Sequence, residues 1–385
     1  MTAPTIDPSP APGPAATPAR TRLPGFDVAR GVALIGVVVM NYHGYLNGGA
    51  QGDPPSLAER IFHPWHGVLS TRFAAVFVTV AGIGTVLLTN RSRLSGDRAA
   101  VRDDRWRLVR RGFLLFWFGF VLNWIWDGTI LFFYGAYFIV AAAIFTLRVR
   151  WLALIGTVSV IGAWAIQIWL LHVERAGGDS SWLSTTALDR SPRGLLFDVT
   201  VNGTHPLLPW LGFFCSGMIL GRLVPDLYRY RRRLLALGAL LLAGGYGLAT
   251  VLRLATKDAT SEFGEQVHQL SLTDPFSRMP LYVVTTLGSS ILAVLVIAQL
   301  ADRFPHSPVV DVLRRAGQMT LSIYALHVVV FDEVVNQRHW VRATGLDTAL
   351  VFALVFWVLA ILLGAWWHRF VGRGPLEAIY RRFGG

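Results

Sequence analysis

The sequence predicts an all-α membrane protein, a polytopic bundle of about ten transmembrane helices with both termini on the cytoplasmic side. The 385-residue chain is 53% apolar and only 15% charged, and its mean hydropathy is +0.48. Apolar runs of about 20 residues, the length needed to cross a bilayer, recur along almost the whole chain. Arginines cluster in alternate loops between these runs, so the net charge of +12 indicates membrane topology rather than nucleic-acid binding.

The chain divides into a tail and one membrane domain. Residues 1–21 are rich in Pro, Ala and Thr and have no apolar core, which predicts a disordered cytoplasmic tail rather than a signal peptide. Residues 22–385 are predicted to form a single transmembrane domain. The predicted spans are 25–46, 67–89, 107–125, 128–147, 151–171, 205–222, 233–252, 280–300, 317–336 and 347–368. The last residues, RGPLEAIYRRF, predict a short amphipathic helix on the anionic inner leaflet.

The distribution of basic residues gives the orientation. With the N-terminus inside, twenty-four Lys and Arg residues fall in inner segments and nine in outer segments, and every inner loop is basic. This pattern predicts cytoplasmic termini in a multi-pass protein of the plasma (inner) membrane. Seven of the ten histidines then lie on or near the outer side, so imidazole acid–base chemistry is expected there.

The first span, LPGFDVARGVALIGVVVMNYHGY, carries polar groups at both ends. Asp27 and Arg30 are three residues apart, share a helix face and can neutralise one another. Asn41 lies fourteen residues after Asp27, nearly four helical turns, and so returns to the same face roughly 21 Å away. His43 follows at the outer end. A polar seam that joins helices would explain this pattern, and so would a functional path through the bilayer.

Two outer loops deliver imidazoles to the membrane surface. The sequence FHPWHG places His63 and His66 three residues apart beside a rigid proline. Arg72 follows about one turn inside the next span, where an arginine needs an anion or carbonyl partner or snorkels to the interface. His205 lies in a second proline-rich corner, THPLLPW. Two histidines without a carboxylate partner are a weak metal signal, and no metal is expected.

Two further features could serve substrate binding. Asp127 ends a tight outer turn after two tryptophans, and aromatic rings beside a carboxylate can bind sugars or simply form an interfacial belt. In the ninth span Tyr324 and His327 share a face, either hydrogen-bonded to a neighbouring helix or lining a cavity. Gly82 and Gly84 predict close helix packing. The single Cys215 allows no disulfide within the chain.

Three of these motifs resemble a known family. The pattern Asp27-x-x-Arg30-Gly31-x-Ala33-Leu34 with Asn41-Tyr42, followed by His63-Pro64-Trp65-His66-Gly67, resembles the heparan-α-glucosaminide N-acetyltransferase catalytic family. The last segments, GQMTLSIYALH and RGPLEAIY, are similar to a related bacterial family of uncharacterised multi-helix membrane proteins. The resemblance implies that His63 is the active histidine and Asn41 the accompanying asparagine. His66 stands where the family shows Asn, in a segment one residue shorter, which leaves His63 and His66 as alternative working imidazoles.

The resemblance implies acyl transfer across a membrane. Acetyl-CoA or another acyl-CoA would be the cytoplasmic co-substrate, with Arg107, Arg110 and Arg111 as candidate phosphate partners, although positive-inside topology alone also explains that basic loop. The acceptor would be an extracytoplasmic sugar, a glycan or glycolipid, or another cell-envelope hydroxyl or amine. The protein's partners would be the lipid bilayer and this acceptor, with a homodimer as one possible assembly. The candidate substrate-binding residues are Asp27, Arg30, His43, Arg72, Asp127, His205 and His327.

A different function class is also open at this stage. Asp27, Arg30, Arg72 and His327 could form a polar relay in a small-molecule or proton-coupled transporter that binds its cargo without covalent change. Release of CoA from acetyl-CoA would distinguish the enzyme from the transporter.

Overall fold

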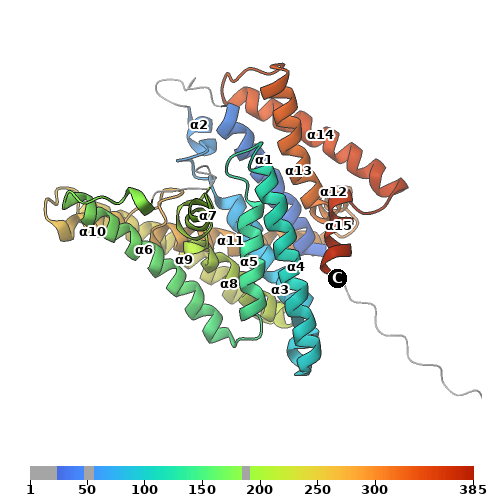
Figure 1. Cartoon of the computed structure of the whole chain (residues 1–385), viewed down its shortest axis with the longest axis horizontal. Helices are drawn as coiled ribbons and strands as arrows, with labels where there is room; N and C mark the ends of the chain where they lie inside the picture. Colours follow the sequence, from blue (N-terminus) through green and yellow to red (C-terminus); the bar gives the residue numbers. More distant parts are fainter. Residues whose placement is uncertain (1–23, 47–55, 184–190) are drawn as a thin grey trace, which may run out of the picture.

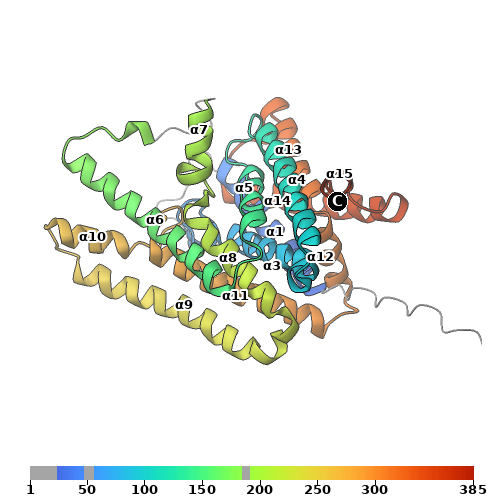
Figure 2. The same ribbon diagram turned by 60° about the horizontal axis from the view of Figure 1, so that its bottom comes forward.

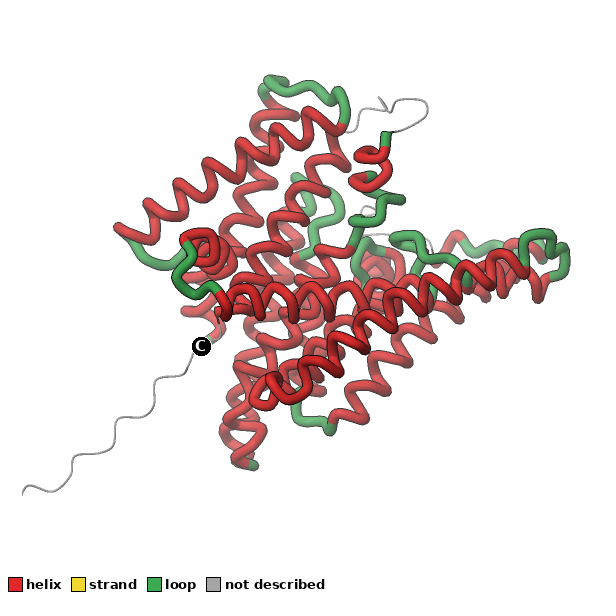
Figure 3. Tube along the Cα trace, turned by 180° about the vertical axis from the view of Figure 1, so that it is seen from behind, coloured by secondary structure: helices red, strands yellow, loops and turns green. Residues whose placement is uncertain are grey.

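The computed structural model describes residues 24–46, 56–183 and 191–385, and within them the chain forms helices, turns and loops without a strand (Figures 1 and 3). The predicted all-α fold is confirmed for this part of the chain, while the predicted tail lies outside the described residues. The helices longer than one turn are α1 (Pro24–Leu46), α2 (Leu57–Phe62), α3 (Arg72–Ser95), α4 (Arg98–Leu122), α5 (Leu131–Ile144), α6 (Val149–Arg175), α7 (Pro192–Phe197), α8 (Leu207–Leu223), α9 (Leu227–Ala255), α10 (Glu262–Leu270), α11 (Pro280–Arg303), α12 (Pro308–Gln318), α13 (Thr320–Phe331), α14 (Leu346–Phe370) and α15 (Pro375–Gly384), with π-helical segments at Asp198–Asn202 and Asp332–Gln337.

Several of these helices can cross a membrane. Six stretches of the described residues are long and apolar enough, and α12 with the extended α13, bent by 80°, would make a seventh. The protein is therefore a multi-pass membrane protein. Each of the ten expected segments falls on a helix, but α4 carries several arginines, α5 has only 14 residues, and α8 and α9 count as one stretch. The number ten and the sides of the termini stay predictions.

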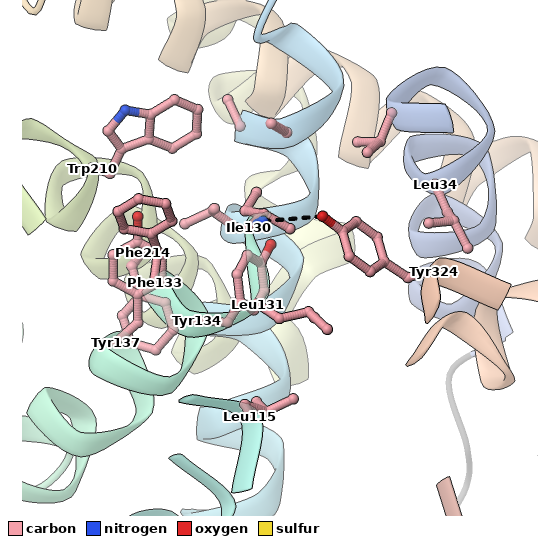
Figure 4. Close-up of a cluster of buried hydrophobic side chains, with 14 of the residues drawn as sticks. Leu34, Leu115, Ile130, Leu131, Phe133, Tyr134, Tyr137, Trp210, Phe214 and Tyr324 are labelled. Carbon is pink, nitrogen blue, oxygen red and sulfur yellow. Dashed lines mark hydrogen bonds between the residues drawn. The ribbon is translucent and has the colours of Figure 1, made fainter. Parts of the chain in front are cut away.

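Helix α1 lies at the centre of the bundle. It packs against α3 and α11 on one side and against α12, α13 and α14 on the other (Figure 1). Its small and branched residues Ala29, Leu34 and Val38 are buried completely. Figure 4 shows how the core continues from Leu34 through the aromatic residues of α5 to Trp210 and Phe214 of α8. Because most of α1 is buried among these helices, Asp27, Arg30 and Asn41 lie next to other protein groups or cavities, while Tyr45 at its end is exposed.

Glycines allow helices α3 and α8 to pack closely. A Cβ at Gly82 of α3 or at Gly217 of α8 would lie closer than 3.0 Å to backbone atoms of the other helix, so side chains larger than hydrogen would separate α3 from α8. The predicted packing role of Gly82 is confirmed. Gly84 is different, because the nearest atom to its Cβ would be an Arg30 side-chain nitrogen at 3.6 Å. Its missing side chain leaves room beside Arg30.

The peripheral helices extend the bundle away from α1. Helix α9 lies along α11, and α6 lies along α8 (Figure 2). At the other end, α15 folds back against α4 and α13. The Glu377 carboxylate accepts hydrogen bonds from the backbone N–H of Leu321 at 2.7 Å and of Ser322 at 3.1 Å. This carboxylate caps the start of α13, where free N–H groups favour a negative charge. The predicted amphipathic tail is thus a docked helix.

Candidate active site

Two cavities lie near opposite ends of α1. The first, which we call the Asn41 cavity, has a volume of about 110 Å³ and is bordered by Asn41, Tyr45, Trp65, Trp126, Asp127 and His205 among others. The second, the Arg107 cavity, has about 580 Å³ and is bordered by Asp27, Arg30, Arg107, Arg111, Gln318, Glu377 and Arg381 among others. The polar residues of the Asn41 cavity come from the predicted outer side, and those of the Arg107 cavity from the predicted inner side.

Asn41 is oriented by His327. The Asn41 amide nitrogen lies 3.2 Å from Nε2 of His327, and Nδ1 of the same imidazole bonds to the Tyr324 carbonyl oxygen. A carbonyl only accepts, so Nδ1 carries the proton and Nε2 accepts one hydrogen from the Asn41 amide. His327 is completely buried. The second amide hydrogen of Asn41 is then available to a molecule in the Asn41 cavity.

His63 is fixed by the loop that joins α2 to α3. A capping box starts α2, with the backbone N–H of Glu59 donating to Ser56 Oγ at 3.2 Å and that of Ser56 donating to the Glu59 carboxylate at 2.6 Å. After α2 ends, Nδ1 of His63 accepts hydrogen bonds from the backbone N–H groups of Trp65 at 3.2 Å and His66 at 3.0 Å. The neutral ring therefore carries its proton on Nε2. His63 is a hydrogen-bond donor in this conformation.

His66 lies beside His63 but differs in exposure and in hydrogen bonding. The two ring centroids are 5.0 Å apart, and His66 is exposed, with no ring hydrogen bond to the described residues. Partial burial, followed by the nearby His66 and His43 imidazoles, lowers the pKa of His63 below its ordinary value. Neither ring borders the Asn41 cavity, but Pro64 and Trp65 between them do.

The rest of the Asn41 cavity is aromatic with a few polar groups. Tyr45 packs on Trp126 with centroids 3.9 Å apart, and its hydroxyl donates to the Asp127 backbone oxygen. His205 Nδ1 pairs with the Thr204 hydroxyl at 2.8 Å. The structure thus brings the predicted residues Asn41, Asp127 and His205 to one cavity, although they lie far apart in sequence.

The Arg107 cavity is basic. Arg30 pairs with Asp27 at 3.4 Å, as the helical spacing predicted, and Arg107 pairs with Asp104 at 2.7 Å. The Arg111 guanidinium lies 5.2 Å from the Tyr380 ring centroid, and burial raises the pKa of Tyr380 to about 12 against the opposing charge of Arg111. Arg110, the third predicted phosphate partner, is exposed and does not border the cavity.

Besides His63, His66, Arg110 and His327, two more predicted site residues, His43 and Arg72, border neither cavity. His43 is buried, and its Nδ1 pairs with the Phe62 carbonyl oxygen, which joins α1 to the end of α2. Arg72 is the first residue of α3, not a residue one turn inside it, because the loop after Pro64 runs on to Thr71. Its partners are the hydroxyls of Ser289 at 2.9 Å and Tyr246 at 2.6 Å, not an anion or carbonyl.

The transporter hypothesis is not favoured. Asp27 and Arg30 border the Arg107 cavity, and His327 bonds to Asn41 and Tyr324. None of the bonds that Arg72 makes in the described residues leads to the other three members of the expected relay. The Asp27–Arg30 pair, His327 and Arg72 thus form three separate sets of local contacts.

Some residues of the cavities were not predicted as site residues. Tyr324 borders both cavities, and Tyr134 and Glu377 border the Arg107 cavity. The sequence did point to Tyr324, because its three-residue spacing from His327 places both on one helix face. For Tyr134, one aromatic residue in an apolar helix, and for Glu377 in the amphipathic tail, the sequence offers no local signal. No group of three or more His, Cys, Asp or Glu side chains within the described ranges is arranged to hold a metal ion.

Comparison with known families gives two matches. The family model described as heparan-alpha-glucosaminide N-acetyltransferase, catalytic, matches residues 22–248, more than half of the chain. A model described as protein of unknown function (DUF418) matches residues 231–384. No curated protein matches the chain. The two matches overlap within α9, and both cavities take residues from both regions: Phe276 and Tyr324 complete the Asn41 cavity, and Gln318 and Glu377 complete the Arg107 cavity.

Proposed function

Since the chain belongs to the heparan-alpha-glucosaminide N-acetyltransferase catalytic family, we propose that it transfers an acyl group, acetyl in the simplest case, from cytoplasmic acyl-CoA to an amine or hydroxyl of an extracytoplasmic sugar or other cell-envelope acceptor. The observation that carries this proposal is the pair of cavities near opposite ends of α1, one basic and one with an oriented amide. A donor and an acceptor held on opposite sides of a membrane need this separation.

The Arg107 cavity suits the donor. Four arginine side chains and two acidic side chains border it, and guanidinium groups bind phosphates with paired hydrogen bonds. Glu377 is occupied in capping α13, and Asp27 interacts with Arg30 and Gln318. Arg107 and Arg111 would hold the phosphates of CoA. The cavity volume of about 580 Å³ is within the range of small-molecule sites.

The Asn41 cavity suits the acceptor. Aromatic rings of Tyr45, Trp65 and Trp126 border it together with Asp127 and His205, a combination that can bind the faces and hydroxyls of a sugar. The cavity of about 110 Å³ would hold only the reacting group, so the rest of the acceptor would lie outside it.

The reaction would be a direct transfer. The acceptor nitrogen or oxygen attacks the thioester carbonyl carbon, the carbonyl oxygen becomes an oxyanion, and the C–S bond then breaks to release CoA. The free hydrogen of the Asn41 amide would donate to the oxyanion. The His63–His66 pair would take the proton of the acceptor and return it to the departing thiolate. Nδ1 of His63 already accepts backbone N–H hydrogen bonds. Of the two imidazoles, His66 would therefore be the one that takes the proton.

The test is release of CoA from acetyl-CoA by purified protein in lipid vesicles, with amine and hydroxyl sugars inside the vesicles as acceptors. We expect acceptor-dependent CoA release and an acetylated sugar. Loss of transfer in His63→Ala with normal protein abundance would assign the reaction to His63, while loss only in His66→Ala would assign it to His66. Movement of a solute across the vesicle membrane without CoA release would refute the acyltransferase proposal and favour the transporter hypothesis.

A further inference from the structure

A single side chain is common to the two cavities. Tyr324 of α13 borders both, and among the described residues no other does. It is 2% exposed. The boundary continues on α5, where Ile130 borders the Asn41 cavity and the next residue, Leu131, borders the Arg107 cavity. We call this boundary, made by Tyr324, Ile130 and Leu131, the septum.

The Tyr324 ring is held across the septum from both ends. Its Cα belongs to α13, and its hydroxyl accepts the backbone N–H of Ile130 at 3.0 Å and pairs with the Thr129 hydroxyl at 3.2 Å. Figure 4 shows the side chain reaching from α13 toward the start of α5, with Leu131 and Tyr134 on the neighbouring turn. These bonds hold the ring at the boundary that the two cavities share.

Tyr134 supplies a second and independent observation. It is 5% exposed and borders the Arg107 cavity. Its hydroxyl has no hydrogen-bond partner among the described residues. A buried hydroxyl without a partner is unfavourable and marks a position where a polar group of a ligand is expected. Its ring packs against Phe77 with centroids 5.4 Å apart and against Tyr137 with centroids 5.7 Å apart.

We propose that the septum is the binding site for the acyl end of the donor, where Tyr134 donates a hydrogen bond to a carbonyl oxygen of the donor arm and Tyr324 limits the length of the acyl chain that fits. This inference rests on the proposed function for the identity of the donor. Along α1, Arg30 and Asn41 are eleven residues apart, about 16 Å at the helical rise. A donor with its phosphates at the basic end must therefore extend an arm toward Asn41, and the septum lies between these ends.

The two tyrosines have different expected effects. In Tyr134→Phe, one hydrogen bond to the donor is lost while no bond within the protein is broken, so the affinity for the donor should fall roughly 3- to 10-fold. The thermal stability should not fall. In Tyr324→Ala the two cavities join, so long acyl chains should bind about as well as acetyl. Tyr324→Phe keeps the ring and loses the hydroxyl, and its preference for short chains should persist.

The test uses binding rather than turnover. Full-length protein in nanodiscs is titrated with unreactive thioether analogues of acyl-CoA that carry two, four, six and eight acyl carbons. For the wild type we expect an affinity that falls with chain length, and for Tyr324→Ala a profile at least 10-fold flatter between two and eight carbons. Tyr324→Leu replaces Tyr324→Ala if the latter does not fold.

Three results would overturn the inference. These are an unchanged length profile in a folded Tyr324→Ala or Tyr324→Leu, an unchanged affinity in Tyr134→Phe, and a wild type that binds none of the analogues. A wild type that binds the analogues with the expected profile but transfers no acyl group would refute the proposed function and leave the septum as a binding site.

Discussion

The contact between Asn41 and His327 leads to the sharpest prediction. If His327 acts only by orienting the Asn41 amide, then replacing His327 by Leu should lower kcat and leave KM for both substrates nearly unchanged. The backbone contacts of His327, including the hydrogen bond from the Tyr42 hydroxyl to its carbonyl at 3.0 Å, do not depend on the imidazole. The substitution therefore removes the 3.2 Å contact with Asn41 and the imidazole bond to Tyr324, while an apolar group fills the space.

The magnitude follows from what each residue contributes. One net hydrogen bond is worth about 0.5–1.5 kcal/mol, so loss of the oriented amide should lower kcat roughly 2- to 12-fold. Removing the amide itself in Asn41→Ala deletes an oxyanion donor and should cost about 10²- to 10³-fold. In the double variant, His327→Leu should cost nothing further, because there is no amide left to orient. The coupling free energy between the two sites should then equal the whole effect of His327→Leu.

The assay is single-turnover CoA release from acetyl-CoA in vesicles with saturating acceptor, for the wild type, both single variants and the double variant. His339→Asn is the control, because His339 is an exposed histidine of the same predicted side that borders neither cavity, and Asn tolerates its positive φ of 54°. Melting temperatures check that all variants are folded. Additive losses in the double variant, or a wild-type kcat in His327→Leu, would refute the positioning role.

Three further predictions concern the donor site, the outer histidines and helix packing. Arg107→Gln and Arg111→Gln should each raise KM for acetyl-CoA roughly 10-fold, because each loses a charge-assisted hydrogen bond of about 1.5 kcal/mol. Arg110→Gln, on the exposed side of α4, should leave KM unchanged. Equal effects of all three substitutions would point to a diffuse charge effect. In an NMR titration the pKa of His63 should lie below its ordinary value of 6.5, so the ring gains its second proton only at lower pH. In His66→Gln the pKa of His63 should rise, because a neighbouring imidazole that lowers it is gone. A wild-type pKa at or above 6.5 would contradict the lowered pKa. Gly217→Ala should abolish the folded peak in a fluorescence-detected size-exclusion assay, because its Cβ would overlap the Thr79 backbone. Gly247→Ala should be tolerated, because nothing lies within 4 Å of its Cβ. Normal folding of Gly217→Ala would show that α3 and α8 can separate.

Local patterns in the sequence were sufficient for the helices and for contacts within one helix. The three-residue spacing of Asp27 and Arg30 predicted their ion pair, and the apolar runs predicted each long helix. The family resemblance is confirmed by the match over residues 22–248. These features depend on residues that are close in sequence, or on motifs that are short and continuous.

Contacts between distant segments could not be predicted in this way. Arg72 was expected to pair with an anion or a carbonyl, but its hydroxyl partners Tyr246 and Ser289 come from α9 and α11. The start of α3 was placed five residues too early, because apolar residues of a loop held by side-chain and backbone hydrogen bonds continue the hydropathy of the helix. The hydrogen bonds at the septum join residues almost 200 positions apart. Helical periodicity relates only residues within one helix, so it cannot predict such a contact.

The thin septum also has an electrical consequence. If the two cavities open to opposite membrane faces, as the distribution of basic residues predicts, the transmembrane voltage falls mainly across the septum that separates them. An ion crossing it would gain or lose about 2.3 kcal/mol per elementary charge for each 100 mV. An acetyl group carries no charge. A protein that passes only the acyl group beyond Tyr324 could therefore work in an energised membrane without dissipating the proton or ion gradients on which the cell depends.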